Sequence, residues 1–189
     1  IPSPLIVTDS IDGTGSGKSK ILEIAAALYL SNPLEMDQQD LKFKSDEITK
    51  RIVSAKGREA KVLYMDNAVG TVSSSKLASW ITSSYISGRA PYGTGEESRP
   101  NDLTIAISSN SATLDDDLAM RAFMINMKRP EYYDPNWLGN VKAYMNKYRW
   151  KILAEIYDIL DSGSPITGNC STRFPEYECD VLRSVCLDR

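Results

Sequence analysis

Histidine is absent from this sequence of 189 residues, and cysteine is scarce. The three cysteines, Cys170, Cys179 and Cys186, all fall within the last twenty residues. Without histidine, and without the close cysteine pairs typical of zinc sites, the chain has no zinc-ligand pattern. An odd number of thiols in this arrangement indicates reduced cysteines, as in a cytoplasmic protein.

Long apolar runs and an excess of positive charge are missing as well. No stretch approaches the roughly 18 apolar residues that span a membrane, and no signal-peptide pattern is visible. The 22 basic and 25 acidic residues give a formal charge of -3, too little positive charge to hold nucleic acid by itself. We expect a soluble cytoplasmic protein whose DNA contacts are local. Because the chain starts without Met, directly before its first expected strand, we also expect an excised domain with neighbouring domains missing.

Short apolar runs alternate with segments of helical periodicity. Runs typical of buried strands occupy residues 5–8, 61–67, 103–110 and 122–127. Helices are expected over residues 18–31, 46–56 (ended by Gly57), 73–87 and 137–160, an edge strand at 41–46, and a long loop at 88–102. This order predicts an α/β fold. We expect a three-layer αβα core with a central parallel sheet over residues 1–130 and a small C-terminal helical region over 131–189.

The glycine-rich stretch DGTGSGKSK, residues 12–20, lies between the first expected strand and the first expected helix. It resembles the phosphate-binding pattern G-x-x-x-x-G-K-[ST], with Asp12 in place of the first glycine. In such a loop, backbone N–H groups surround an anion at the positive end of a helix dipole. Asp tolerates left-handed conformations, so we predict that Asp12 points away from the ligand and that the loop binds nucleotide. The candidate nucleotide-binding residues are Gly13, Thr14, Gly15, Ser16, Gly17, Lys18, Ser19 and Lys20.

A metal partner for this loop stands at the end of the apolar run VLYMD. Mg2+ takes oxygen ligands, which the hydroxyl of Ser19 and the carboxylate of Asp66 would supply. The alternatives are an ordinary glycine-rich turn at the loop and a turn-forming aspartate at Asp66. The pairing of the two motifs favours ATP and Mg2+ as cofactors.

The segments DGTGSGKS, KVLYMDN, LTIAISSN and DDDLAMRAF, taken in order, resemble the motifs of the AAA+ ATPases over residues 5–127, about two thirds of the chain. Within that group, residues 62–89 and 108–127 are similar to the ATPase domains of phage, plasmid and mobile-element replication proteins, which are compared with superfamily 3 helicases. The resemblance implies an ATPase that acts as a DNA helicase or translocase in replication. It also implies a homo-oligomer, commonly a ring of six, with single- or double-stranded DNA and further primase or DNA-handling domains as partners.

The resemblance assigns roles to residues outside the loop. Asn110 would orient the attacking water or sense the terminal phosphate, and Arg121 would be an arginine finger in the neighbouring subunit's site. Alternatively, Asn110 is a turn residue and Arg121 a salt-bridged helix end beside the acidic run 115–117. Arg149 is either a second sensor or a surface arginine.

Two departures from the family pattern bear on catalysis. Asn67 stands where many AAA+ enzymes carry a glutamate base, and an amide orients water but cannot take its proton. Either Asp115, Asp116 or Asp117 supplies a carboxylate, or hydrolysis is slow. The other departure is that Met120 precedes Arg121 where the mobile-element group has paired arginines.

The loop at residues 88–102 lies where superfamily 3 helicases place a DNA-contacting hairpin. Arg89, Tyr92 and Arg99 would contact phosphates and bases there, although an ordinary exposed loop is an equal alternative. A nucleotide-dependent assembly module with little or no hydrolysis is the second candidate function. A small kinase is disfavoured because the chain has no arginine-rich lid.

Overall fold

The computed structural model describes residues 3–10, 12–13, 15–90, 95–132 and 134–162, together with Phe174, Tyr177 and Val181. Thr14, Tyr92 and the three cysteines lie outside these residues. The chain divides into two compact units, Ile1–Arg129 and Pro130–Arg189. In the described part of the second unit, the long helix α7 (Trp137–Ser162) agrees with the predicted C-terminal helix. Of the helices described, none has the length and apolar character that crossing a membrane demands.

The first unit is built on a five-stranded sheet with the strand order β2-β3-β7-β1-β9. Every neighbouring pair is parallel, which confirms the central parallel sheet expected from the sequence. Parallel strands end at the same edge of a sheet, so the polar ends of the apolar runs meet there. The strands are β1 (Leu5–Asp9), β2 (Leu34–Met36), β3 (Val62–Ala68), β7 (Thr104–Ser109) and β9 (Ala122–Asn126).

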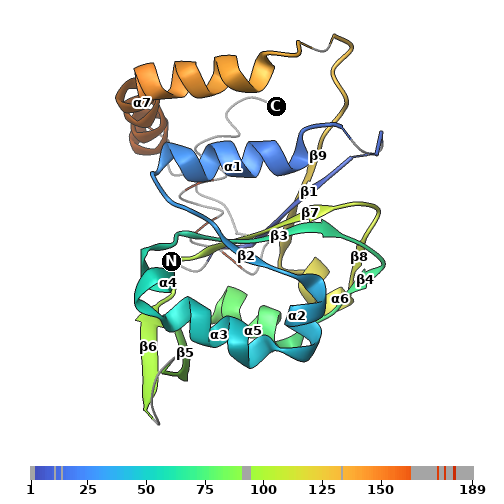
Figure 1. Ribbon diagram of the computed structural model, residues 1–189, viewed down its shortest axis with the longest axis vertical. Helices are drawn as coiled ribbons and strands as arrows, with labels where there is room; N and C mark the ends of the chain where they lie inside the picture. Colours follow the sequence, from blue (N-terminus) through green and yellow to red (C-terminus); the bar gives the residue numbers. More distant parts are fainter. Residues whose placement is uncertain are drawn as a thin grey trace. The chain divides into compact units, whose positions relative to one another are not determined.

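Helices cover both faces of this sheet. Figure 1 shows α1 (Lys18–Leu28) on one face, and α2 (Gln38–Phe43), α3 (Ser45–Val53) and α5 (Ser75–Thr82) on the other. The strands that face both layers are almost continuously apolar, as buried parallel strands are. The remaining short elements are α4 (Ala55–Glu59), α6 (Asp116–Ala119) and a two-stranded parallel sheet of β4 (Thr71–Val72) and β8 (Thr113–Leu114).

The core forms between the sheet and these helices. Most side chains of the central strands are buried, as are the inward faces of α3 and α5, where apolar residues recur at helical spacing. Each such side chain contributes about 1.5–3 kcal/mol to folding. The largest of them include Leu5, Leu63, Met65 and Ile107 in the sheet, and Ile52, Leu77 and Ile81 in the helices.

The edge strand predicted at residues 41–46 is wrong, because that segment forms the end of α2 and the start of α3. Asp37 begins α2, and its carboxylate accepts the N–H of Gln39 at 2.6 Å. Leu41 is buried, whereas Phe43 is 73% exposed, so their alternation does not describe one face of a strand. The strand at the edge is instead β2, paired with β3.

The prediction that Gly57 ends a helix is also wrong. The helix α3 ends at Val53, and the hydroxyl of Ser54 accepts the N–H of Gly57 at 3.1 Å as the cap of α4. Gly57 therefore lies inside α4. A Cβ there would lie only 1.9 Å from the carbonyl oxygen of Arg51, so the glycine permits the close approach of α4 to α3.

The predicted helix over residues 73–87 ends early, at Thr82. The side-chain amide of Asn101 donates to the carbonyls of Trp80 and Ser83 at 2.5 and 2.7 Å, which satisfies two acceptors at the helix end. The chain then forms β5 (Tyr85–Arg89), which pairs antiparallel with β6 (Glu96–Pro100). The segment expected to be a loop is thus a β-hairpin.

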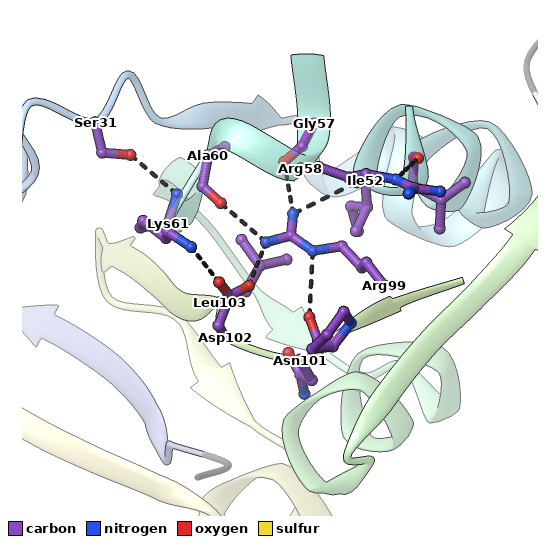
Figure 2. Close-up of polar contacts among 12 residues, drawn as sticks. Ser31, Ile52, Gly57, Arg58, Ala60, Lys61, Arg99, Asn101, Asp102 and Leu103 are labelled. Carbon is purple, nitrogen blue, oxygen red and sulfur yellow. Dashed lines mark hydrogen bonds and ion pairs between the residues drawn. The ribbon is translucent and has the colours of Figure 1, made fainter. Parts of the chain in front are cut away.

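Arg99 fixes this hairpin to the body of the unit (Figure 2). Its side chain is 3% exposed, and its guanidinium donates to the carbonyls of Gly57 at 2.5 Å and Ala60 at 3.2 Å. It also pairs with Asp102, which in turn pairs with Lys61 directly before β3. The predicted contact of Arg99 with DNA is therefore wrong, because no face of this guanidinium is turned to solvent. Arg89, by contrast, is exposed.

Candidate nucleotide-binding site

The glycine-rich segment turns sharply between the end of β1 and the start of α1. Gly13, Gly15 and Gly17 have φ angles of 74°, 83° and 87°, in the left-handed region that favours glycine. Gly17 is the residue that precedes the first turn of α1. The three glycines are therefore required by the backbone of the turn itself, and the helix N-terminus faces the loop that they form.

Lys18 folds back over this loop. Its side chain donates from Nζ to the carbonyl oxygen of Gly13 at 2.7 Å, and the residue is only 8% exposed. The hydroxyl of Ser16 donates to the same carbonyl at 3.4 Å. A phosphate oxygen can replace that carbonyl as the acceptor of the ammonium, so the lysine is positioned for an anion held by the loop. Lys20, one turn into α1, instead pairs with Glu23 at 2.6 Å.

Ser19 and Asp66 meet at the carboxyl edge of the sheet. The serine hydroxyl donates to Asp66 Oδ1 at 2.8 Å, although 47 positions separate them in sequence. The same oxygen accepts hydrogen bonds from Tyr64 Oη at 2.7 Å and Ser108 Oγ at 2.5 Å. Burial alone would raise the pKa of Asp66, but these hydroxyl donors hold it below its usual value. The carboxylate is thus ionised at neutral pH.

The donor set at this edge suits Mg2+, which binds carboxylate and hydroxyl oxygens and keeps several waters. Ser19 and Asp66 are the two residues that would hold the ion together with phosphate oxygens. Within the described ranges, no group of three or more His, Cys, Asp or Glu side chains lies close enough to hold a metal ion alone.

Tyr64 is the most perturbed side chain of the site. Burial and its hydrogen bond to Asp66 raise the pKa of Tyr64 to about 12. The phenol therefore keeps its proton, and donates it, throughout the neutral range. Sequence reasoning missed this residue; the available signal was its position two residues before Asp66, on the same face of β3.

Asp12 is turned toward the chain that follows β9. Its Oδ2 accepts the backbone N–H of Arg129 at 2.7 Å. The guanidinium of that arginine lies over the loop, since a Cβ built on Gly15 would be 3.1 Å from Arg129 Nη2. Arg129 was also missed by sequence reasoning, although a cationic pair directly after the fourth apolar run was visible. The binding of nucleotide by a loop that carries Asp12 stays a prediction, which titration with ATP and Mg2+ up to millimolar concentrations tests.

The backbone conformation at position 67 explains why an asparagine is found there. It lies at a register shift between β3 and β7, and its φ of 53° is left-handed. Its N–H donates to Ser108 Oγ at 2.9 Å. Asparagine adopts this region more easily than glutamate, so an asparagine suits the local bulge better than a glutamate would.

A pair of substitutions at Asn67 tests this conformational role. We expect Asn67→Ala to lower the free energy of unfolding by about 1 kcal/mol, because a left-handed alanine is strained. Asn67→Gly should cost less, since glycine adopts the same φ without strain. Urea unfolding of both variants measures the difference. Equal losses in the two variants would contradict the conformational explanation.

Asn110 directly follows β7, next to the end of β3. Its N–H donates to the carbonyl of Ala68 at 2.9 Å, which places its backbone beside the strand that carries Asp66. The structure thus brings Lys18, Ser19, Asp66, Asn67 and Asn110 to one edge of the sheet. Asp115 is engaged elsewhere, since its Oδ1 accepts the N–H of Leu118 at 2.8 Å and caps α6.

Arg121 is bound within its own chain. Its guanidinium pairs with Asp117 Oδ1 at 2.7 Å and donates to the carbonyl of Ala78 at 2.9 Å and to the hydroxyl of Thr82 at 3.3 Å. The side chain is 16% exposed. This geometry fits the salt-bridged helix end that was the alternative to an arginine finger. In α7, the guanidinium of Arg149 lies 4.7 Å from the ring centre of Trp150.

A parallel sheet with a glycine-rich loop between β1 and α1 is an α/β fold of the P-loop type, and one of the solved structures that resemble it is a helicase. The NrS-1 C-terminal region in its apo A form matches with a TM-score of 0.57 and 12% identity, over 77% of this chain and 34% of that chain. The JCV helicase, crystallised with a thiazolopyridine-containing acetamide, matches with a TM-score of 0.53 and 12% identity, over 97% of this chain and 51% of that chain. The chain thus spans about a third to a half of the length of these two proteins. No protein-family model and no curated protein matches the chain.

Proposed function

We propose that the chain is a magnesium-dependent ATPase domain of the AAA+ type, which works as a helicase or translocase motor in DNA replication of a mobile element. The contact of Ser19 with Asp66, at 2.8 Å beside a loop of left-handed glycines, is the observation that carries this proposal. A hydroxyl at the helix N-terminus and a carboxylate at a neighbouring strand end are the protein ligands that a magnesium-nucleotide complex needs.

Some residues of the site would bind the nucleotide, and others would support its hydrolysis. Backbone N–H groups of the loop and the ammonium of Lys18 would hold the phosphates, and Arg129 would add positive charge above Gly15. Bound Mg2+ would neutralise the phosphate charge that develops during transfer. Asn67 and Asn110, which lie at adjacent strand ends, would orient the attacking water by hydrogen bonds.

Assembly into a homo-oligomeric ring, six subunits in the family, follows from the role proposed for Arg121. Its guanidinium would leave Asp117 and reach the nucleotide of the neighbouring subunit. A charge supplied in this way accelerates phosphoryl transfer by about 10³–10⁵. The exposed Arg89 on the β5–β6 hairpin is the candidate for contact with single- or double-stranded DNA.

The alternative is a nucleotide-dependent assembly module with little or no hydrolysis. Two observations favour it over the motor. Asn67 cannot act as a base, and the ion pair of Arg121 with Asp117 occupies the candidate finger within its own subunit.

Phosphate release from wild type, Lys18→Ala and Arg121→Ala, alone and mixed, tests the proposal. We expect each variant to lose activity and an equimolar mixture to recover part of it, because a site shared between subunits needs one intact loop and one intact arginine. Lys56→Ala, which removes an exposed lysine of α4 outside the loop, is the matched control and should keep its activity. No recovery on mixing would contradict a shared site.

Single-stranded DNA separates the motor from the assembly module. A motor should release phosphate faster when DNA is added, whereas a module should stay near background with and without it. The same samples, examined by light scattering with and without ATP, show whether nucleotide drives assembly. Assembly without DNA-stimulated turnover would favour the alternative.

A further inference from the structure

Asp66 is surrounded by hydroxyl groups, two of which have no place in the motif that identified it. Ser19, Tyr64 and Ser108 all donate to the same oxygen, Oδ1, at 2.5–2.8 Å. They come from α1, β3 and β7, so three separate elements converge on one carboxylate atom. Three donors at one oxygen fix the plane and the direction of a carboxylate more firmly than a single hydrogen bond can.

We propose that Tyr64 and Ser108 are positioning residues, which hold Asp66 in the orientation that binds the metal of a magnesium-nucleotide complex. The inference rests on the proposed function, because it assigns how that site is built. It adds two residues that touch neither the nucleotide nor the metal and act through Asp66 alone.

The geometry of β3 explains why a tyrosine serves here. Tyr64 and Asp66 are two residues apart on one strand, so their side chains leave the same face of the sheet. The ring of Tyr64 is buried, with 6% of the residue exposed, and packing therefore restricts where its hydroxyl lies. Its single proton is donated to Asp66 at 2.7 Å. A phenylalanine would fill the same space without that hydrogen bond.

Ser108 links the carboxylate to the bulge in β3. Its hydroxyl has one proton, which it donates to Asp66 at 2.5 Å, and it accepts the N–H of Asn67 at 2.9 Å. Ser108 itself is 1% exposed, so its hydroxyl is held in place by the packing of β7. The position of Asp66 is therefore tied to the backbone conformation of the residue that follows it.

These two donors matter most when the metal is bound. Ser19 Oγ is itself a proposed magnesium ligand, so binding of the metal would compete with its hydrogen bond to Asp66. Tyr64 and Ser108 are not proposed metal ligands, so their hydrogen bonds would continue to orient Asp66. Mg2+ demands near-ideal octahedral geometry, and partners that orient the ligands of a metal typically change its affinity by 10–100-fold when they are lost.

Tyr64→Phe tests the inference with a readout other than turnover. A fluorescent ATP analogue is bound to the protein first in EDTA and then with increasing MgCl2. We expect the magnesium concentration at half-maximal change to rise about 10-fold in the variant. Binding of the analogue in EDTA should match wild type, because the loop and Lys18 are untouched. The thermal midpoint, measured in parallel, shows that the variant is folded.

Ser108→Ala should give a similar shift, and Ser109→Ala is its matched control. Ser109 is also 1% exposed on β7, but its hydroxyl accepts the N–H of Ala112 at 2.9 Å and has no contact with Asp66 among the hydrogen bonds described. We expect Ser109→Ala to lower stability without moving the magnesium midpoint. This contrast separates a positioning role from a general loss of packing.

Two results would overturn the inference in different ways. If wild type shows a magnesium-dependent signal and both Tyr64→Phe and Ser108→Ala keep its midpoint, the positioning role is refuted while the proposed function stands. If wild type shows no magnesium-dependent binding of the analogue, the proposed function fails and the inference with it.

Discussion

Asp66→Asn is expected to reduce magnesium-dependent phosphate release at least about 100-fold, beyond the upper end of what loss of a supporting group costs. The substitution removes the negative charge that would face the proposed metal ion. The amide oxygen of asparagine can still accept from the three hydroxyls that donate to Oδ1, so the NH₂ group, which cannot bind a cation, takes the place of the second oxygen. Steady-state phosphate release over a range of MgCl2 concentrations measures the effect.

The control for this prediction is Asp46→Asn, which makes the same chemical change at an exposed position in the first turn of α3. It should release phosphate at the wild-type rate. Thermal unfolding of both variants distinguishes loss of chemistry from loss of structure. If Asp66→Asn keeps more than a tenth of the wild-type activity, Asp66 is not a ligand of the catalytic metal.

Arg99→Met is expected to lower the free energy of unfolding by about 2–4 kcal/mol, because hydrogen bonds from a buried charged donor to main-chain carbonyls are lost. The arginine donates to the carbonyls of Gly57 and Ala60 and pairs with Asp102 (Figure 2). Methionine fills much of the volume but donates to neither carbonyl, so Ala60 loses this donor and Gly57 keeps only the N–H of Ala60 at 3.1 Å. Urea unfolding, followed by tryptophan fluorescence, measures the loss.

Arg58→Met is the matched control for Arg99→Met. Arg58 also joins α4 to the hairpin, through Glu97 at 2.8 Å, but 46% of its side chain is exposed. An exposed ion pair contributes about 0–1 kcal/mol, so this variant should unfold close to wild type. Similar losses in the two variants would show that burial of Arg99 does not decide its contribution.

The sheet and the loop were predictable because their signals are local. The apolar runs that became β1, β3, β7 and β9 are continuous, which is typical of strands buried on both faces. Residues 12–20 carry glycines at the positions where the backbone turns left-handed. The pairing of Ser19 with Asp66 followed from these two patterns, because the carboxyl ends of parallel strands share one edge.

The hairpin and the role of Arg99 were not predictable, because tertiary contacts decide them. Residues 73–87 have helical periodicity throughout, but Asn101 satisfies carbonyls at the end of α5 and the chain turns into β5. Nothing in the sequence around Arg99 shows that its guanidinium is buried. The carbonyls that it binds lie about 40 positions earlier in the chain.

The roles of Tyr64 and Ser108 in the site could not be predicted from the sequence either. A tyrosine and a serine are both ordinary residues in a strand. Neither belongs to the patterns that identify a phosphate loop or its aspartate. Their shared contact with Asp66 depends on the register of β3 against β7, which no single segment specifies. Arg129 likewise reaches Gly15 only because β9 lies beside β1.

The fastening of the hairpin by Arg99 has a mechanical consequence. Asp102 connects Arg99 to Lys61, which directly precedes β3, the strand that carries Asp66. The base of the hairpin is therefore joined by ion pairs to the strand on which the candidate site is built. A probe attached near Arg89 should consequently move together with the whole α/β unit, without bending at the base of the hairpin.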